Sequence, residues 1–240
     1  MGEKDFSDLA LVGDDSLSYV PRDVFRAVRS GIADPIARAE VLADLCRINT
    51  LYMIMQAGSG HIGSSFSSTD IITWLWTEAL TDPNGTSRDA DVYFSSKGHD
   101  VPALYSLLIA TEKLDFSLLP KLRQLNGLPG HPDVSTPFIA TNTGSLGMGI
   151  SKAYGMARAN RYTGRGGRIV VMTGDGELQD GAGRYALGDE LLGKFDDEGD
   201  NQDEREDEQR EQERRDDLPN HVPVDDARHA FLLSASLARM

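Results

Sequence analysis

Cysteine is nearly absent from this chain of 240 residues, and Cys46 is its only thiol. A single cysteine cannot form an intrachain disulfide, and it excludes a metal site built from several thiolates. Such a composition is typical of a reducing compartment. We therefore expect a cytoplasmic protein.

Long apolar runs and basic clusters are also missing. No stretch reaches the roughly 20 apolar residues that cross a bilayer, and the first residues lack the basic leader and apolar segment of a secretion signal. No group of Lys and Arg is large enough to replace the counterions of a nucleic acid. We expect neither membrane insertion nor nucleic-acid binding.

Acidic charge is present but concentrated in one segment. The chain has a net charge of -14, and residues 196–217 hold 13 Asp or Glu against 4 Arg, which leaves only -5 for the rest. Glu/Arg pairs could support a solvated helix there, whereas the lack of an apolar stripe favours disorder. We predict that residues 195–240 form a disordered, acidic, low-complexity tail.

Helical and strand patterns alternate between that tail and an N-terminal arm, residues 1–34, in which we expect at most a helical turn. Apolar periodicity predicts helices over 35–56, 70–76 (capped by Ser68 or Thr69), 102–114, 118–125 and 144–161, and strands over 91–96 and 168–173. This alternation predicts an α/β domain over residues 35–194 with a mostly parallel sheet, helices on both faces and an incomplete C-terminus.

A carboxylate directly follows the second predicted strand, in the sequence Gly174-Asp175-Gly176. Glycine allows the backbone to come close to a bulky anion. An aspartate at the carboxyl end of a parallel strand is a hard oxygen ligand for a cation such as Mg²⁺. The pattern predicts a metal site beside a diphosphate, with Asp175 as a metal ligand.

Three histidines lie in glycine-containing loops. His61 could bind a substrate or carry a proton, or it could cap a helix end. His99 follows a strand and precedes a helix, a position that suits an anion, although a histidine that ends a turn is common there. His131 lies between a glycine and a proline, where a surface histidine would also be ordinary.

The stretch from Thr143 to Gly149 is rich in glycine and looks at first like a loop that cradles phosphate. The dinucleotide-binding fingerprint requires a preceding strand and a tight turn, and these glycines instead continue into a helix. Close packing of that helix against another subunit, or against a flat ring, therefore remains an alternative.

Taken in order, five motifs resemble the thiamine diphosphate-binding N-terminal part of the transketolase family, from about Val41 to Gly181. The motifs are Ser59-Gly60-His61-Ile62-Gly63, Ser96-Lys97-Gly98-His99, Gly130-His131-Pro132, Thr143-Gly144-Ser145-Leu146-Gly147-Met148-Gly149-Ile150-Ser151 and Gly174-Asp175-Gly176-Glu177-Leu178-Gln179-Asp180-Gly181. The resemblance implies the thiamine diphosphate-binding fold.

The resemblance also implies roles for individual residues. Asp175 would bind Mg²⁺ or another divalent cation, and His61 and His131 would line the catalytic channel. Asp180 stands where the family usually has a glutamate near the subunit interface. The cofactor-binding residues would be His99, Gly144, Ser145 and Leu146 (the last three at the aminopyrimidine ring), together with Gly174, Gly176 and Glu177.

The activity implied is two-carbon ketol transfer between sugar phosphates. Family members also need a pyrimidine-binding domain, further along the chain or on a separate subunit, and a dimer in which the cofactor lies between subunits. We find no such domain, and whether the chain is an enzyme by itself stays open. We expect an N-terminal subunit or fragment that is inactive alone.

The family completes its metal site with an asparagine at the end of the next strand, and we find no such strand after Gly181. Asn201 has no apolar run before it, and Asn220 is too distant. The change of composition after Gly181 suggests a reading-frame change or a truncated copy. Translating the other two frames tests this, because an apolar strand ending in Asn should appear.

Two other functions remain possible on the sequence. One is a non-catalytic interaction or regulatory protein that keeps the fold and uses a natural acidic tail for docking. The other is a related synthase or dehydrogenase component that uses the same cofactor.

Overall fold

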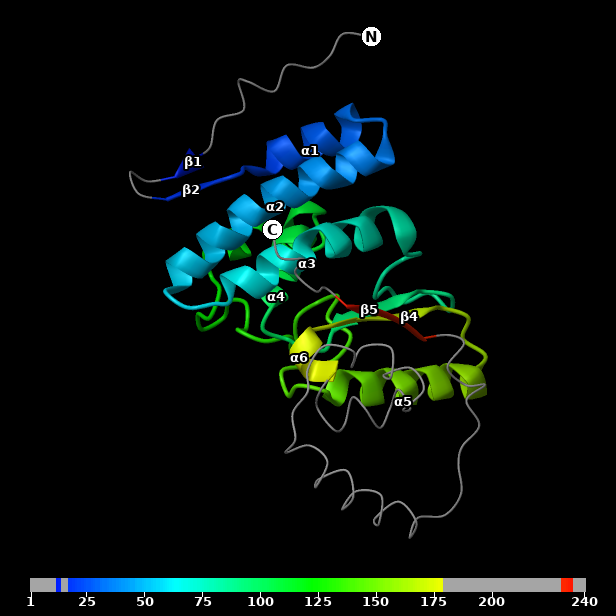
Figure 1. Ribbon diagram of the computed structural model, residues 1–240. Helices are drawn as coiled ribbons and strands as arrows, with labels where there is room; N and C mark the ends of the chain where they lie inside the picture. The colour runs from blue at the N-terminus through cyan, green and yellow to red at the C-terminus, as the bar shows by residue number, and fades with distance from the viewer. Residues whose placement is uncertain (1–11, 14–16, 179–229, 235–240) are drawn as a thin grey trace, which may run out of the picture.

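A computed structural model describes residues 12–13, 17–178 and 230–234, and Figure 1 shows their arrangement. In chain order the elements are β1 (Val12–Gly13), β2 (Ser18–Tyr19), α1 (Arg22–Gly31), α2 (Pro35–Ala57), α3 (Ile62–Trp74), the π-helical turn η1 (Leu75–Ala79), β3 (Val92–Ser95), α4 (Val101–Ala110), the 3₁₀ turn η2 (Phe116–Leu118), α5 (Met148–Thr163), β4 (Ile169–Thr173), α6 (Asp175–Leu178) and β5 (Ala230–Ser234).

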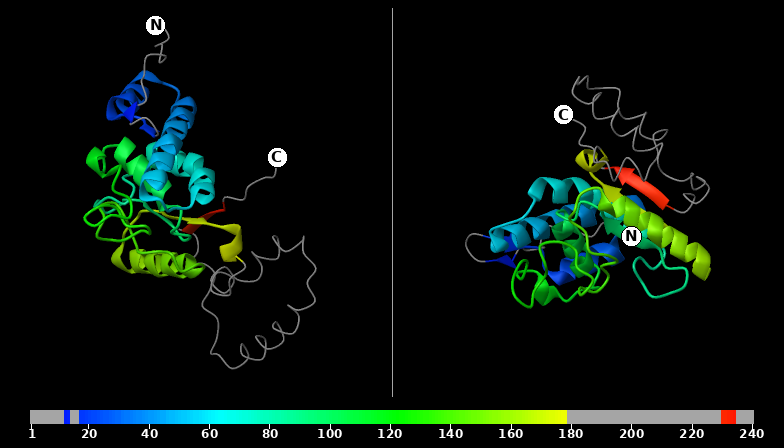
Figure 2. Two further views of the ribbon diagram at one scale, coloured as in Figure 1. Left: turned by 90° about the vertical axis from the view of Figure 1, so that its left-hand side faces the viewer. Right: turned by 90° about the horizontal axis from the view of Figure 1, so that it is seen from below.

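The main sheet has the order β3-β4-β5, and both pairs of neighbours are parallel. Helices α2, α3 and α4 lie on one side of it and α5 lies on the other (Figures 1 and 2). The predicted α/β class, with a parallel sheet and helices on both faces, is confirmed.

Side chains of β3 and β4 alternate between these layers, as the pleat of a strand requires. Tyr93 and Met172 belong to the large core under α2 and α4. Phe94 and Val171 belong to a smaller core with Ala153 of α5. Every residue of β4 is buried, which explains why its sequence is a continuous apolar run.

Helix α2 agrees with the helix predicted from residue 35. Asp34 caps it by accepting a hydrogen bond from the Ala37 amide at 2.8 Å, Pro35 occupies its first turn, and Gly58 ends it at φ +61°. These are the usual start and stop signals of a helix. Even α2, at 23 residues, is not apolar enough to cross a membrane, and neither is any other helix in the described ranges.

Helix α3 begins at Ile62, earlier than predicted. Ser68 and Thr69 do not cap it, because their hydroxyls lie inside the helix and donate to the Ser65 carbonyl at 3.0 and 2.7 Å. Hydroxyls that bond back to the preceding turn are compatible with a continuous helix. The correction places His61 at the residue immediately before α3.

The N-terminal region also differs from the expected arm. Helix α1 buries Val24, Phe25 and Val28 in the main core, so order begins well before Pro35. The Val20 amide donates to the buried Asn49 side chain of α2 at 2.6 Å. Three apolar residues on one helical face suffice to hold this short helix against α2.

Two further predictions were wrong, one for the segment after α4 and one for the end of the chain. The helix predicted over 118–125 is reduced to the 3₁₀ turn η2. Residues 230–234, expected in the tail, instead pair with β4 as β5. Hydrogen bonding to the edge of β4 accounts for this strand, which no local pattern required. The boundary at 194/195 and residues Asp180, Gly181, Asn201 and Asn220 lie outside the described residues.

Candidate functional site

The motifs singled out in the sequence meet where β3 and β4 end. The segment from Ser96 to His99 follows β3, and the turn from Gly174 to Glu177 follows β4. The Ser96 amide donates to the Met172 carbonyl at 2.8 Å, which continues the pairing of the two strands into these loops. In open α/β sheets this carboxyl edge is where ligands bind.

Two of the predicted histidines lie next to each other at this edge. The ring centroids of His61 and His99 are 4.8 Å apart, with an angle of 48° between the rings. His61 occupies the capping position of α3, but its side chain makes no capping hydrogen bond. Its ring therefore contacts His99 instead of serving as a helix cap.

The third histidine reaches the same place through a contact between two glycines. Gly98 has φ +73°, and a Cβ there would lie 2.8 Å from the Gly144 amide nitrogen. Gly144 has φ +139°, and a Cβ there would lie 2.8 Å from Cδ2 of His131. Only glycine allows this approach, which brings the three histidine-containing loops together.

The pKa of His99 is lowered below its ordinary value of 6.5, chiefly because the ring is partly buried. The Asp100 carboxylate raises it, and the charges of His61 and Lys97 lower it. The imidazole is therefore held neutral at neutral pH, with one N–H to donate and one nitrogen to accept.

This shift predicts that stability falls on acidification. As the pH drops through about 6.5, unfolded His99 takes up a proton more readily than folded His99, so the free energy of unfolding decreases. Urea unfolding between about pH 7.5 and 5.5 measures the decrease, and His99→Asn should reduce its slope. An unchanged slope in the variant would contradict the assignment to His99.

Asp175 and Gly176 form the exposed outer side of the turn after β4. A Cβ on Gly176 would meet no atom within 4 Å, so the space beside the aspartate is open. An accessible carboxylate next to open backbone can bind a cation together with a bulky anion. The predicted metal ligand therefore has room for its role.

Glu177 points inward from the same turn and is only 2% exposed. Its Oε1 accepts hydrogen bonds from the Ser96 hydroxyl at 2.6 Å and from the Gly147 amide at 3.1 Å. Its Oε2 accepts from the Gly174 amide at 3.0 Å. Protein donors thus bind both carboxylate oxygens of Glu177. Its contact with a cofactor stays a prediction.

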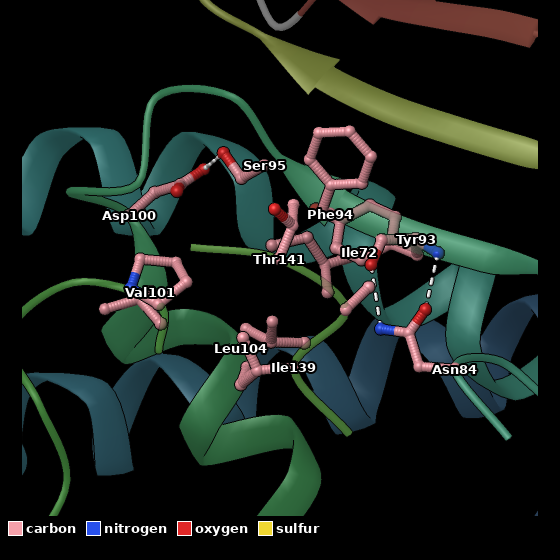
Figure 3. Close-up of a pocket in the computed structure, with 12 residues that line it drawn as sticks. Ile72, Asn84, Tyr93, Phe94, Ser95, Asp100, Val101, Leu104, Ile139 and Thr141 are labelled. Carbon is pink, nitrogen blue, oxygen red and sulfur yellow. Dashed lines mark hydrogen bonds between the residues drawn. The ribbon is translucent and has the colours of Figure 1, made fainter. Parts of the chain in front are cut away.

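The turn that carries His99 is held by a buried ion pair. Lys97 Nζ lies 3.4 Å from Asp100 Oδ2, and the two side chains are 6% and 1% exposed. Figure 3 shows the Ser95 hydroxyl donating to the same carboxylate, at 2.8 Å. Asp100 Oδ1 has no hydrogen-bond partner among the described residues, and Asp100 lines a cavity of about 10 Å³, which is the size of one water molecule.

A larger hollow lies beside the glycine-rich loop. It has a volume of about 150 Å³ and is lined by Asn142, Thr143, Ser145, Met148, Gly149 and Lys152. Ser145 and Leu146 of the loop are exposed. The predicted ring-contacting residues thus lie at the surface, next to an open space.

The described residues show no preformed metal site around Asp175. They contain no cluster of three or more His, Cys, Asp or Glu side chains arranged to hold a metal. Strand β5 does supply the neighbouring strand that the sequence did not reveal, with Ser234 in register with Thr173. Its last residue is Ser234, so it does not supply the asparagine that the resemblance implies.

Sequence reasoning missed the polar residues that support the site, namely Ser96, Lys97 and Asp100. All three are buried although two of them carry charges. Their position beside Gly98 and His99 in one short segment was the available signal. Their partners could not be predicted, because Glu177 lies far along the chain from Ser96.

Comparison with known proteins decides the ancestry of the chain. The family described as "Transketolase, thiamine diphosphate binding domain" matches residues 38–187. This chain belongs to the transketolase family. The match includes each of the loops that meet at the carboxyl edge of the sheet, and it confirms the resemblance seen in the motifs.

Individual members of the transketolase family agree with this assignment. One of them, a subunit of apulose-4-phosphate transketolase from Actinobacillus succinogenes, is 37% identical over 127 residues, which is 51% of this chain and 46% of that protein. Transketolase 2 of Escherichia coli is 36% identical over 183 residues, 66% of this chain and 27% of that one. The matched part thus spans less than half the length of these relatives.

A solved structure shows the same fold. Transketolase from Leishmania mexicana superposes with a TM-score of 0.56 and 30% sequence identity, over 62% of this chain and 24% of that chain. These comparisons do not test the roles of individual residues. The site residues therefore remain predictions that the geometry described above supports.

Proposed function

We propose that the chain binds thiamine diphosphate with Mg²⁺ or another divalent cation at the carboxyl edge of β3 and β4. One observation carries the proposal: the paired rings of His61 and His99, the Gly98–Gly144 contact and the exposed Asp175 all lie at this edge. The neutral His99 ring and the closely packed glycine backbone suit a diphosphate, and the hard carboxylate oxygen of Asp175 suits its cation.

Each residue would act through a property visible in the structure. His99, held neutral by burial, would donate its N–H to a phosphate oxygen. Gly176 would let the diphosphate approach the backbone, because no atom lies within 4 Å of its missing Cβ. The segment Gly144 to Leu146, in which Ser145 and Leu146 are exposed, would contact the aminopyrimidine ring from beside the 150 Å³ hollow.

The cation would bind the Asp175 carboxylate, because the described residues offer no cluster of three or more metal-binding side chains. Mg²⁺ keeps several waters and commonly takes further oxygens from substrate phosphates. Diphosphate oxygens and water would therefore complete its shell. Binding of cation and cofactor should then be mutually dependent.

The proposed chemistry is ketol transfer between sugar phosphates. Bound thiamine diphosphate would supply the carbanion chemistry that cleaves the bond next to a ketose carbonyl. His61 and His131, both exposed beside His99 and Gly144, would hold and move protons on the sugar hydroxyls and carbonyl.

A complete enzyme would need a partner. The Actinobacillus succinogenes relative is named as one subunit of its transketolase, which implies that it works with a second subunit. We propose that this chain likewise requires a pyrimidine-binding domain, in a dimeric cytoplasmic assembly, and that it transfers no two-carbon unit alone.

Titration calorimetry with thiamine diphosphate tests the proposal. Saturable binding is expected in Mg²⁺ and not in excess EDTA, and thiamine without the diphosphate should bind far more weakly. The titration is repeated with a pyrimidine-binding subunit supplied separately. No metal-dependent binding under either condition would overturn the proposal and favour a non-catalytic interaction protein.

A further inference from the structure

The described residues direct three hydrogen-bond donors at the buried carboxylate of Glu177. The Ser96 hydroxyl and the Gly147 amide donate to Oε1, and the Gly174 amide donates to Oε2. Hydrogen bonds of this kind to an ionised group are stronger than those between neutral groups. The carboxylate is therefore the acceptor in each of these three contacts.

The orientation of the Ser96 hydroxyl is determined as well. Its oxygen accepts a hydrogen bond from the Gly149 amide at 3.1 Å, so its proton is directed at Glu177. A Cβ on Gly149 would lie 2.3 Å from this hydroxyl oxygen. Glycine at this position is thus required for the serine to fit between the loop and the glutamate.

These contacts change the interpretation of the glycine-rich loop. Its sequence suggested amides that cradle a phosphate, but the Gly147 amide is bound by Glu177 and the Gly149 amide by Ser96. Both groups belong to the protein itself. An internal carboxylate occupies the place that an anionic ligand would need.

The same carboxylate joins three segments of the site. Ser96 directly follows β3, Gly147 directly precedes α5, and Gly174 directly follows β4. Asp175 lies on the exposed side of the turn whose inner side is Glu177. The position of the metal ligand therefore depends on how the turn is held from within.

We propose that Glu177 is a positioning residue: it acts as an internal anion that binds the amides of the glycine-rich loop and thereby orients Asp175 and the Gly98–Gly144 contact for the ligand. We call Glu177 with its three donors, the Ser96 hydroxyl and the amides of Gly147 and Gly174, the clamp. The diphosphate binds outside this clamp and not to the Gly147 or Gly149 amides. The ligand part of this inference rests on the proposed function, whereas the clamp itself does not.

Glu177→Gln is the test variant, because glutamine keeps the shape but replaces one oxygen with a donor. In either orientation its NH₂ group faces a backbone amide, of Gly174 or of Gly147. Glu40→Gln is the matched control, since Glu40 is exposed on α2. Ser96→Ala is a milder variant that removes one donor and frees the Gly149 amide.

Amide hydrogen exchange of the protein without ligand measures the clamp. In Glu177→Gln, peptides covering 144–149 and 174–178 should exchange about tenfold faster or more, while α2 is unchanged. In Ser96→Ala the increase should be confined to the Gly149 amide. Unchanged exchange in these peptides, or equal acceleration of α2, would overturn the clamp.

Calorimetry with thiamine diphosphate and Mg²⁺ measures its effect on the ligand. Glu177→Gln should raise the Kd about tenfold, and Glu40→Gln should leave it unchanged. An unchanged Kd in Glu177→Gln, with faster loop exchange, would contradict the positioning role. If the wild type binds no cofactor at all, the proposed function fails, and hydrogen exchange still decides whether the clamp exists.

Discussion

Asp175→Asn is expected to weaken metal-dependent binding of thiamine diphosphate by about a hundredfold or more, which corresponds to about 2.8 kcal/mol. Asparagine keeps the shape of the side chain but removes the exposed carboxylate that we propose as the ligand of the cation. The diphosphate would then approach without its counterion. Calorimetry in Mg²⁺ measures the change in Kd.

Asp23→Asn is a matched control, because Asp23 is an exposed aspartate on α1, an element that does not contribute to the site. Its Kd should equal that of the wild type, and both variants should unfold at similar urea concentrations. Equal affinity of Asp175→Asn and wild type would show that the cation does not use this carboxylate.

Asp100→Ala is expected to lower the free energy of unfolding by about 3–5 kcal/mol, because it leaves the buried ammonium of Lys97 without its partner. Lys97 is 5% exposed and cannot reach water without moving the turn that carries His99. The Ser95 hydroxyl also loses its acceptor. Urea unfolding followed by circular dichroism measures the loss.

Two further variants separate this effect from a simple loss of charge. Asp70→Ala breaks an ion pair with Arg47 in which the aspartate is 61% exposed, and it should cost less than about 1 kcal/mol. The double variant Lys97→Met/Asp100→Asn should recover part of the stability lost in Asp100→Ala. Equal, small losses for Asp70→Ala and Asp100→Ala would contradict the buried pair.

Much of the fold follows from local sequence. The strand at 168–173 is predictable because β4 is apolar from Ile169 to Met172, as a strand buried on both faces requires. Helix α2 is predictable because Asp34, Pro35 and Gly58 are ordinary start and stop signals. The carboxyl-edge position of Asp175 then follows, because β3 and β4 are parallel.

Other features depend on contacts between distant parts of the chain. Ser68 and Thr69 suggested a helix start, yet their hydroxyls bond within α3. Helix α1 is ordered by burying Phe25 in the main core. Strand β5 forms through pairing with β4 and has no sequence signal of its own beyond a short apolar run.

Contacts between distant residues also determine the arrangement of the site. Single histidines in loops are ambiguous in sequence, and only the 4.8 Å approach of His61 and His99 brings them together. The amides of Gly147 and Gly149 suggested phosphate binding, because the sequence cannot show that Glu177 and Ser96 already bind them. Long-range hydrogen bonds decide what a glycine-rich loop does.

The central claim is that cation and diphosphate bind at the carboxyl edge of β3 and β4. A crystal structure of the chain with thiamine diphosphate and Mn²⁺, with an anomalous difference map that locates the metal, tests it most directly. We expect an anomalous peak at bonding distance from Asp175, with the diphosphate between that peak and His99. A peak elsewhere, or a diphosphate bound to the Gly147 and Gly149 amides, would contradict it.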